Sequence, residues 1–266
     1  PLCWLASGLH KGEYRVNREY QYGFSSRGNA MYDVARRELK AQTMVSVLGD
    51  FCAARLQDLR VLNVGGSTGI IDNYLADYFA SVTGVDIDED AITFARENYN
   101  KDNLIFDVGD ALNLQFPDNS FDIVICSQVY EHVPDAHSMM NEIFRVLVPG
   151  GICYFAANNR LMWNEPRYNL PLLSVIPRPL ANIYVRLAGK AKHYHELHYT
   201  YWGLRKLVRR FHIHDYTLKL VNDPIKYSIA YMIKPGSTKA SLAGFMARYL
   251  IWLSPGYIWL LEKPSD

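Results

Sequence analysis

The sequence predicts an α/β fold, in which a doubly wound, mostly parallel sheet is covered by helices on both faces. From Val61 onward, short apolar runs of strand character alternate with helical patterns over short connections, which is typical of a parallel sheet. A glycine-rich turn, "GGSTG" at 65–69, joins the first run to a helix and would bring backbone close to a ligand. The 266 residues, 49% hydrophobic and 21% charged, can bury the core of one decorated domain or two small ones, which excludes a disordered or fibrous chain.

The elements before Asn158 follow a regular order. Residues 1–60 are expected to form an N-terminal helical segment, because apolar side chains follow helical spacing from about Asn29 to Leu48. Residues 61–158 then form a ligand-binding core. Its predicted strands are "RVLNV", "SVTGVDI", "NLIFDVGDA", "FDIVICS" and "ICYFAA", and its predicted helices are "GIIDNYLADYFA", "DEDAITFARENYN" and "DAHSMMNEIFRVLVPGG".

The alternation stops after Asn158. Residues 159–199 are rich in proline, aromatic and basic residues, and we expect them to form an inserted cap. Residues 200–266 return to the sheet, with Thr200 as N-cap of the helix "TYWGLRKLVRRF" and with strands at "HIHDYTLKLV" and "YIWLLEKP". A second, apolar insertion at 236–255 precedes the last strand.

Charge is unevenly distributed along the chain, although the net charge is only +1. Residues 61–150 hold 3 Lys and Arg against 15 Asp and Glu, whereas 160–220 hold 11 against 3, with five of the eight histidines. Such asymmetry indicates two different tasks in one chain. The acidic part suits a nucleoside-type cofactor, and the basic part should face something anionic. The high apolar content argues against nucleic acid as that anionic partner.

The four cysteines, at 3, 52, 126 and 153, show no metal-like or disulfide-like spacing. Together with an N-terminus that lacks the basic region of a signal peptide, they favour a cytoplasmic protein. The histidines of "HYHELH" do not have the i, i+4 spacing of a helical zinc pair. We therefore expect no metal.

The residues around the glycine turn indicate its ligand. Ser67 and Ile70 stand where a dinucleotide fingerprint would have glycines, and no Gly-Lys-Ser/Thr of a P-loop is present. Asp86 ends the next strand and could accept both hydroxyls of a ribose. Asp110 follows the third strand and could bind an adenine amino group. All of these fall on the edge where open α/β sheets bind ligands.

In this order, "VLNVGGSTG", "GVDID", "GDALNLQFPDNSFDIVICSQVYEHV" and "EIFRVLVPGG" resemble the class I S-adenosylmethionine-dependent methyltransferases, closest to their small-molecule and lipid-acting branch. The resemblance is strong over residues 61–151 and looser over the final helix and strands. It implies a Rossmann-like sheet of seven strands, the last antiparallel, with S-adenosyl-L-methionine as cofactor. The cofactor-binding residues that it implies are Asn63, Gly65, Gly66, Ser67, Gly69, Asp86, Ile87, Asp110, Ala111, Ser127 and Gln128.

Two positions depart from the family's pattern. Asn63 stands where the family usually has an acidic residue, and Ser67 where it usually has glycine. Asn63 can form a hydrogen bond but cannot pair electrostatically with the cofactor's ammonium group. These departures leave open a non-catalytic, cofactor-binding protein as an alternative to an enzyme.

Two histidines are candidates for catalysis. Methyl transfer from a sulfonium is an in-line displacement, and an oxygen nucleophile often needs a base. His132, just after the fourth strand, and His198, in the cap, could serve. In the resembling family the equivalent of His132 commonly helps to build the cofactor pocket, and His198 could only support its loop. No N/D-P-P-Y follows strand four, where "SQVYE" stands instead, and this favours oxygen or carbon acceptors over amino groups.

Residues 170–192 and 241–260 mix apolar and aromatic side chains with Arg and Lys, but neither is an uninterrupted apolar run long enough to span a bilayer. They fit attachment to the surface of a membrane, at its inner face, as well as a lid or a dimer contact. We therefore expect a methyltransferase of an amphiphilic acceptor, such as a lipid-linked glycan or a quinone precursor. A soluble small-molecule acceptor and an NAD-linked reductase are the alternatives.

Overall fold

The predicted sheet is present in the computed structural model, which describes residues 18–27, 29–52 and 55–265. Residues 1–17, with Cys3, lie outside the described residues. The seven strands lie in the order β3-β2-β1-β4-β5-β9-β8. Their bounds are β1 Arg60–Val64, β2 Ser81–Asp86, β3 Leu104–Val108, β4 Phe121–Ser127, β5 Leu147–Asn158, β8 His212–Asp215 and β9 Gly256–Glu262.

Strand β9 is antiparallel to both of its neighbours, β5 and β8, whereas β1 to β5 are parallel to one another. The predicted last antiparallel strand is therefore confirmed. Because the five parallel strands share one direction, the residues that follow β1, β2, β3 and β4 meet at one edge of the sheet.

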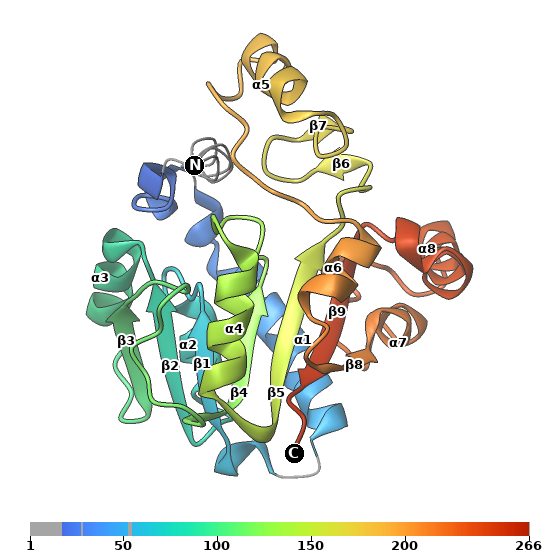
Figure 1. Cartoon of the computed structure of the whole chain (residues 1–266). Coiled ribbons are helices and arrows are strands. Elements are labelled where there is room, and N and C mark those ends of the chain that lie inside the picture. Colours follow the sequence, from blue (N-terminus) through green and yellow to red (C-terminus); the bar gives the residue numbers. More distant parts are fainter. Residues whose placement is uncertain (1–17, 28, 53–54, 266) are drawn as a thin grey trace, which may run out of the picture.

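Helices cover both faces of the sheet (Figure 1). Helices α1 (Val34–Phe51), α2 (Ile70–Leu75) and α7 (Thr217–Asn222) pack on one face, and α4 (Ala136–Val146) and α6 (Tyr201–Leu207) on the other. Helix α3 (Glu89–Asn98) packs on Phe106 of β3. Strand β4 shows the consequence, because Val124 and Cys126 enter one core cluster while Ile123 and Ile125 enter the other. The doubly wound fold is confirmed.

The cap contains a two-stranded sheet, β6 (Asn164–Glu165) and β7 (Leu170–Pro171), followed by α5 (Arg178–Leu187). It stands above the carboxyl edge of the main sheet (Figure 1) and has a small core of its own around Tyr168, Leu173 and Val185. The second insertion forms α8 (Thr238–Tyr249) and a 3-10 turn, η5 (Ile251–Leu253), next to α7.

Several predicted elements were wrong in extent. The helix predicted at "GIIDNYLADYFA" ends at Leu75, and the one predicted through "VLVPGG" ends at Val146, where β5 begins. The first helix begins at Val34 and not near Asn29, because Asp33 caps it by accepting a hydrogen bond from the backbone N–H of Arg36. The strand predicted at "HIHDYTLKLV" ends at Asp215. There the Asp215 carboxylate accepts a hydrogen bond from the backbone N–H of Thr217, and the chain turns into α7.

Candidate active site

The turn after β1 requires glycine for two physical reasons. Gly65 has a φ of +76°, and a Cβ on it would lie 2.6 Å from Cγ2 of Val129. Gly69, just before α2, has a φ of +74°, and its Cβ would lie 2.7 Å from a ring carbon of Phe106. The backbone of the turn therefore passes close to its neighbours in a left-handed conformation that other residues rarely adopt. Ser67 adopts a φ of +55° without that freedom.

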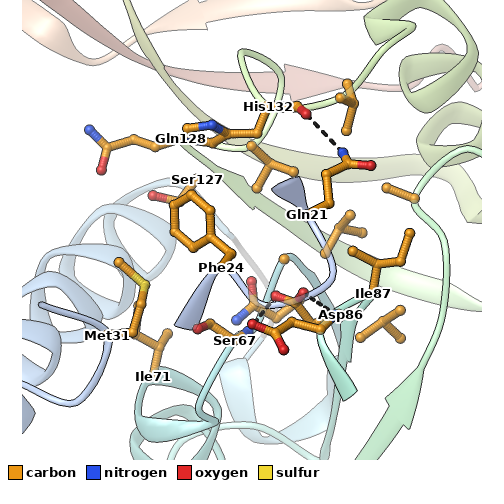
Figure 2. Close-up of a pocket in the computed structure, with 18 of the residues that line it drawn as sticks. Gln21, Phe24, Met31, Ser67, Ile71, Asp86, Ile87, Ser127, Gln128 and His132 are labelled. Atoms are coloured by element: carbon orange, nitrogen blue, oxygen red, sulfur yellow. Dashed lines mark hydrogen bonds between the residues drawn. The ribbon is translucent and has the colours of Figure 1, made fainter. Parts of the chain in front are cut away.

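Asp86 points into a pocket at the carboxyl edge of the sheet, which we call the cofactor pocket (Figure 2). Its carboxylate accepts hydrogen bonds from the backbone N–H groups of Ser67 (2.8 Å) and Asp88 (2.9 Å). These bonds fix its orientation, and each oxygen keeps a lone pair for a further donor. Burial raises the pKa of Asp86, an effect that the two N–H donors oppose. The side chain is therefore prepared to bind a donor pair such as the hydroxyls of a ribose.

Asn63 is backed by a buried acid that the sequence did not reveal. Its side-chain N–H donates to Asp72 of α2 at 2.7 Å, so the Asn63 oxygen is left as the acceptor within the cofactor pocket. Asp72 is fully buried, and a Cβ on Gly66 would lie 2.7 Å from its second carboxylate oxygen. Burial raises the pKa of Asp72 to about 7. The acidic group that the family usually has at the Asn63 position is thus supplied by Asp72, whose side chain contacts Asn63 from the side away from the pocket.

Most of the residues expected to bind the cofactor line this pocket: Asn63, Gly65, Ser67, Asp86, Ile87, Asp110, Ala111, Ser127 and Gln128. Gly66 and Gly69 do not line the pocket; they lie in the same turn, where they pack closely against Asp72 and Phe106, respectively. Asp110 accepts from the backbone N–H of Leu112 and forms an ion pair with Arg18 at 2.7 Å, so its contact with an adenine stays a prediction.

The segment before α1, residues 18–27 and 29–33, covers the cofactor pocket and was missed by the sequence analysis. Gln21, Phe24 and Met31 line the pocket (Figure 2). The Gln21 side chain donates to the backbone oxygen of His132 at 2.8 Å, and the backbone N–H of Ser25 donates to Asp88 at 2.7 Å. This stretch shows no hydrophobic periodicity from which its contact with the pocket could have been predicted.

Helix α1 contributes two cations to the pocket, Arg37 and Lys40. Arg37 is 7% exposed and donates to the backbone oxygen of Gly66 at 3.3 Å. Burial lowers its pKa, while Asp72 and Asp86 act in the opposite direction. Burial also lowers the pKa of Lys40 to about 8. The signal available in the sequence was the position of Arg37 on the apolar stripe of α1, four residues before the buried Ala41.

His132, a candidate base, lies in the pocket lining. Its ring packs against Phe24 with centroids 5.1 Å apart, and its Nδ1 lies 3.4 Å from the hydroxyl of Tyr20. Burial, with Arg167 and His198 nearby, lowers its pKa to about 3. His132 is therefore neutral at physiological pH and a weak base.

His198, the other candidate base, is not part of this lining. Its side chain is 1% exposed, and its Nε2 lies 4.0 Å from Glu165. Burial lowers its pKa to about 4. Three buried carboxyl groups lie in this region, where the cap meets the core: Glu131, Glu165 and Glu196. Burial raises the pKa of Glu131 to about 8.

The hydrogen-bonding and charged groups of the pocket fit S-adenosylmethionine. Asp86 offers acceptors for ribose hydroxyls, and the glycine turn leaves room for a close backbone contact. The Asn63 oxygen suits an ammonium group, and the buried guanidinium of Arg37 suits a carboxylate. Among the described residues, no group of three or more His, Cys, Asp and Glu could hold a metal ion.

Comparison with known proteins supports this fit. Residues 62–155 match a family described as "Methyltransferase domain". The chain is 38% identical over 120 residues to a fatty-acid O-methyltransferase of Mycolicibacterium smegmatis, a match that covers 44% of this chain and 42% of that protein. It is 33% identical over 105 residues to a ubiquinone biosynthesis O-methyltransferase of Pseudomonas fluorescens, covering 38% of this chain and 45% of that protein. The matches thus span less than half the length of these curated relatives.

A solved structure of an S-adenosylmethionine-dependent methyltransferase from Mesorhizobium loti shares the fold, with a TM-score of 0.55 at 17% identity over 88% of this chain and all of that one. The matched segment, residues 62–155, contains the glycine turn, Asp86 and His132 of the cofactor pocket. Residues 62–155 therefore carry a methyltransferase domain, and the chain shares the fold of an S-adenosylmethionine-dependent methyltransferase.

Proposed function

We propose that the protein transfers the methyl group of S-adenosylmethionine to an oxygen or carbon atom of an amphiphilic acceptor. The observation that carries the proposal is the pocket in which Asp86, the glycine turn and the Asn63–Asp72 pair converge. The similarity to a fatty-acid O-methyltransferase and to a ubiquinone biosynthesis O-methyltransferase supports an oxygen acceptor of lipid type.

The residues of the pocket divide the work of holding the cofactor, which supplies an electrophilic methyl group when bound. Asp86 would hold the ribose, and Asn63 and Arg37 the charged groups of the amino-acid end. Phe24 and Met31 of the covering segment would exclude water from the reacting atoms. The main catalytic contribution is then the alignment of acceptor and methyl group, because His132, the histidine of the pocket, is a weak base.

The surface of the cap supports contact with an anionic membrane. On α5, Leu180, Ile183 and Leu187 are 56%, 46% and 83% exposed and share one helical face. Arg186, Lys190 and Lys192, on and just after α5, are exposed as well. On α8, Leu242, Phe245 and Tyr249 are also exposed and repeat the same spacing. Exposed apolar side chains beside cations fit interfacial attachment.

No helix among the described residues has the length and apolar character needed to cross a bilayer. The described cysteines, Cys52, Cys126 and Cys153, are free thiols. Free thiols are typical of the reducing cytoplasm. Together with the exposed apolar and basic side chains of the cap, they support a location at the cytoplasmic face of a membrane.

Cofactor binding and turnover test the proposal together. Calorimetry should show micromolar binding of S-adenosylmethionine and S-adenosylhomocysteine. Radiolabelled methyl transfer should favour fatty acids and quinol precursors over water-soluble phenols. Binding without turnover on any acceptor would instead indicate a cofactor-binding protein, and preference for the phenols would indicate a soluble acceptor. No binding of either ligand contradicts the proposal altogether.

Sedimentation with vesicles tests the membrane contact. Replacing Arg186 and Lys190 by Glu should reduce binding to anionic vesicles by at least about 30-fold, because two cations near the surface contribute roughly 1 kcal/mol each. Arg209→Glu, on an exposed residue after α6, is the matched control. Arg178 is unsuitable for this test, because its guanidinium donates to the backbone oxygen of His195 at 2.9 Å and holds the cap together. Equal binding of the double variant and the control would refute attachment through α5.

A further inference from the structure

A second cavity, of about 470 Å³, opens at the same edge of the sheet, and we call it the α7–α8 cavity. It is enclosed by α1, the carboxyl-edge ends of β5 and β9, α7, residues 229–233 and α8. Its apolar lining includes Met44, Tyr154, Leu220, Ile229, Leu242 and Met246. No carboxylate is found among its described lining residues, and the charged ones are Lys40 and Lys239. An apolar space with cations and no acid favours an apolar ligand that carries a negative charge.

The two cavities adjoin at Lys40, Ser127 and Gln128, which line both. The Lys40 ammonium donates to the Gln128 side-chain oxygen at 2.9 Å, and Gln128 has a φ of +59°. Such a conformation in a residue other than glycine is often kept for a functional contact.

The junction lies at the end of the cofactor pocket away from the ribose site. Ser127 ends β4, whereas Asp86 ends β2, and β1 lies between these strands. At about 4.8 Å per strand, the two ends are roughly 10 Å apart. A ligand in the α7–α8 cavity would therefore meet the part of the cofactor that is remote from its ribose.

The base available in the cofactor pocket also restricts the acceptor. Because the pKa of His132 is lowered to about 3, this residue is a poor acceptor for the proton of an alcohol or phenol. A carboxylate is already ionised at neutral pH and needs no base. The half-buried ammonium of Lys40 at the junction would balance the charge of the carboxylate.

We propose that the α7–α8 cavity binds the hydrocarbon chain of a fatty carboxylate, whose carboxylate group is held by Lys40 where the two cavities meet. A carboxylate oxygen forms the new O–CH₃ bond, the S–CH₃ bond breaks, and its electron pair stays on sulfur, so the products are a methyl ester and a thioether, with no proton released. This inference rests on the proposed methyltransferase function.

Binding of saturated fatty acids in the presence of S-adenosylhomocysteine, measured by calorimetry, tests the proposal. Affinity should rise about fourfold per methylene from octanoate to dodecanoate, the increment for burying one such group. Lys40→Met should weaken dodecanoate binding roughly 10- to 100-fold, the loss of a charged hydrogen bond, and leave dodecanol unchanged. Lys40→Arg should retain most of the affinity for dodecanoate.

A cavity-filling pair tests the location. Ala243→Trp places an indole in the lining of the α7–α8 cavity and should abolish chain-length dependence. Ser241→Trp adds the same bulk to an exposed position of α8 outside that lining and should bind dodecanoate normally. Equal effects of the two tryptophans, or dodecanoate binding that Lys40→Met does not weaken, would overturn the inference.

The failure of this inference can be distinguished from failure of the proposed function. If S-adenosylhomocysteine binds and a different acceptor is methylated while dodecanoate is ignored, only the fatty-carboxylate assignment is wrong. If S-adenosylhomocysteine itself does not bind, the methyltransferase function fails and the inference with it.

Discussion

The two cavities at the carboxyl edge of the sheet are built in different ways. Apart from its cover by the segment before α1 and the cations of α1, the cofactor pocket is made mostly by residues at the carboxyl ends of successive strands: the turn after β1, Asp86 at the end of β2, Asp110 after β3 and Gln128 after β4. The α7–α8 cavity draws on Met44, Tyr154, Leu220 and Leu242, which lie far apart in the sequence. The first is fixed by local backbone geometry and hydrogen bonds, the second by the packing of remote elements.

The comparison separates what is general to the domain from what is specific to this chain. The matched family segment, residues 62–155, contains the strand-end residues of the cofactor pocket. Much of the α7–α8 cavity comes from α1, α7 and α8, outside that segment. Changes in one cavity should therefore leave the other intact, except at the shared residues Lys40, Ser127 and Gln128.

The largest effect is expected for Asp86→Ala. Two hydrogen bonds from a ligand to a carboxylate contribute roughly 1.5–3 kcal/mol each, so S-adenosylhomocysteine should bind at least about 100-fold more weakly. Asp107→Ala, at a half-exposed carboxylate in the neighbouring strand β3, is the matched control. Calorimetry measures both variants. Dodecanoate binding should survive Asp86→Ala, and its loss would show that the two cavities are not independent.

A glycine pair tests the local geometry of the turn. In Gly66→Ala, the new Cβ would lie 2.7 Å from the Asp72 carboxylate, and we expect a loss of about 1–3 kcal/mol in the free energy of unfolding, with weaker cofactor binding. Gly49→Ala, on an exposed helical position of α1, should instead stabilise the protein by about 0.5–1 kcal/mol. Denaturant unfolding measures both variants. Equal stability of Gly66→Ala and the wild type would contradict the close contact.

The smallest effect is expected from pH at the junction of the cavities. Lys40 faces Arg36 and Arg37 of its own helix and Glu131 after β4, and its pKa is lowered to about 8. It loses its charge as pH rises through that value, so above about pH 8 the KM for dodecanoate should rise up to about tenfold per pH unit, with kcat little changed. In Lys40→Arg, the KM should stay flat to about pH 10. A pH-independent KM in the wild type would argue against Lys40 as the carboxylate's partner.

The sequence by itself determined the sheet and the centre of the cofactor pocket. Gly65, Asp86 and Gln128 could be placed because each lies at the end of a strand or directly after it, and parallel strands bring their ends to one edge. Hydrophobic periodicity and strand-end position are local signals, and the sequence displays them. For the same reason, Thr200 was correctly identified as a helix cap, where it accepts from the N–H of Gly203.

Only the tertiary structure decided what surrounds that centre. Asp72 supplies the charge behind Asn63, Gln21 and Phe24 cover the pocket, and Lys40 joins it to the α7–α8 cavity. These contacts depend on how α1, α2 and α8 pack around the sheet. Side-chain packing between remote segments leaves no spacing in the sequence from which it could be inferred, because any chain of suitable shape can supply the contact.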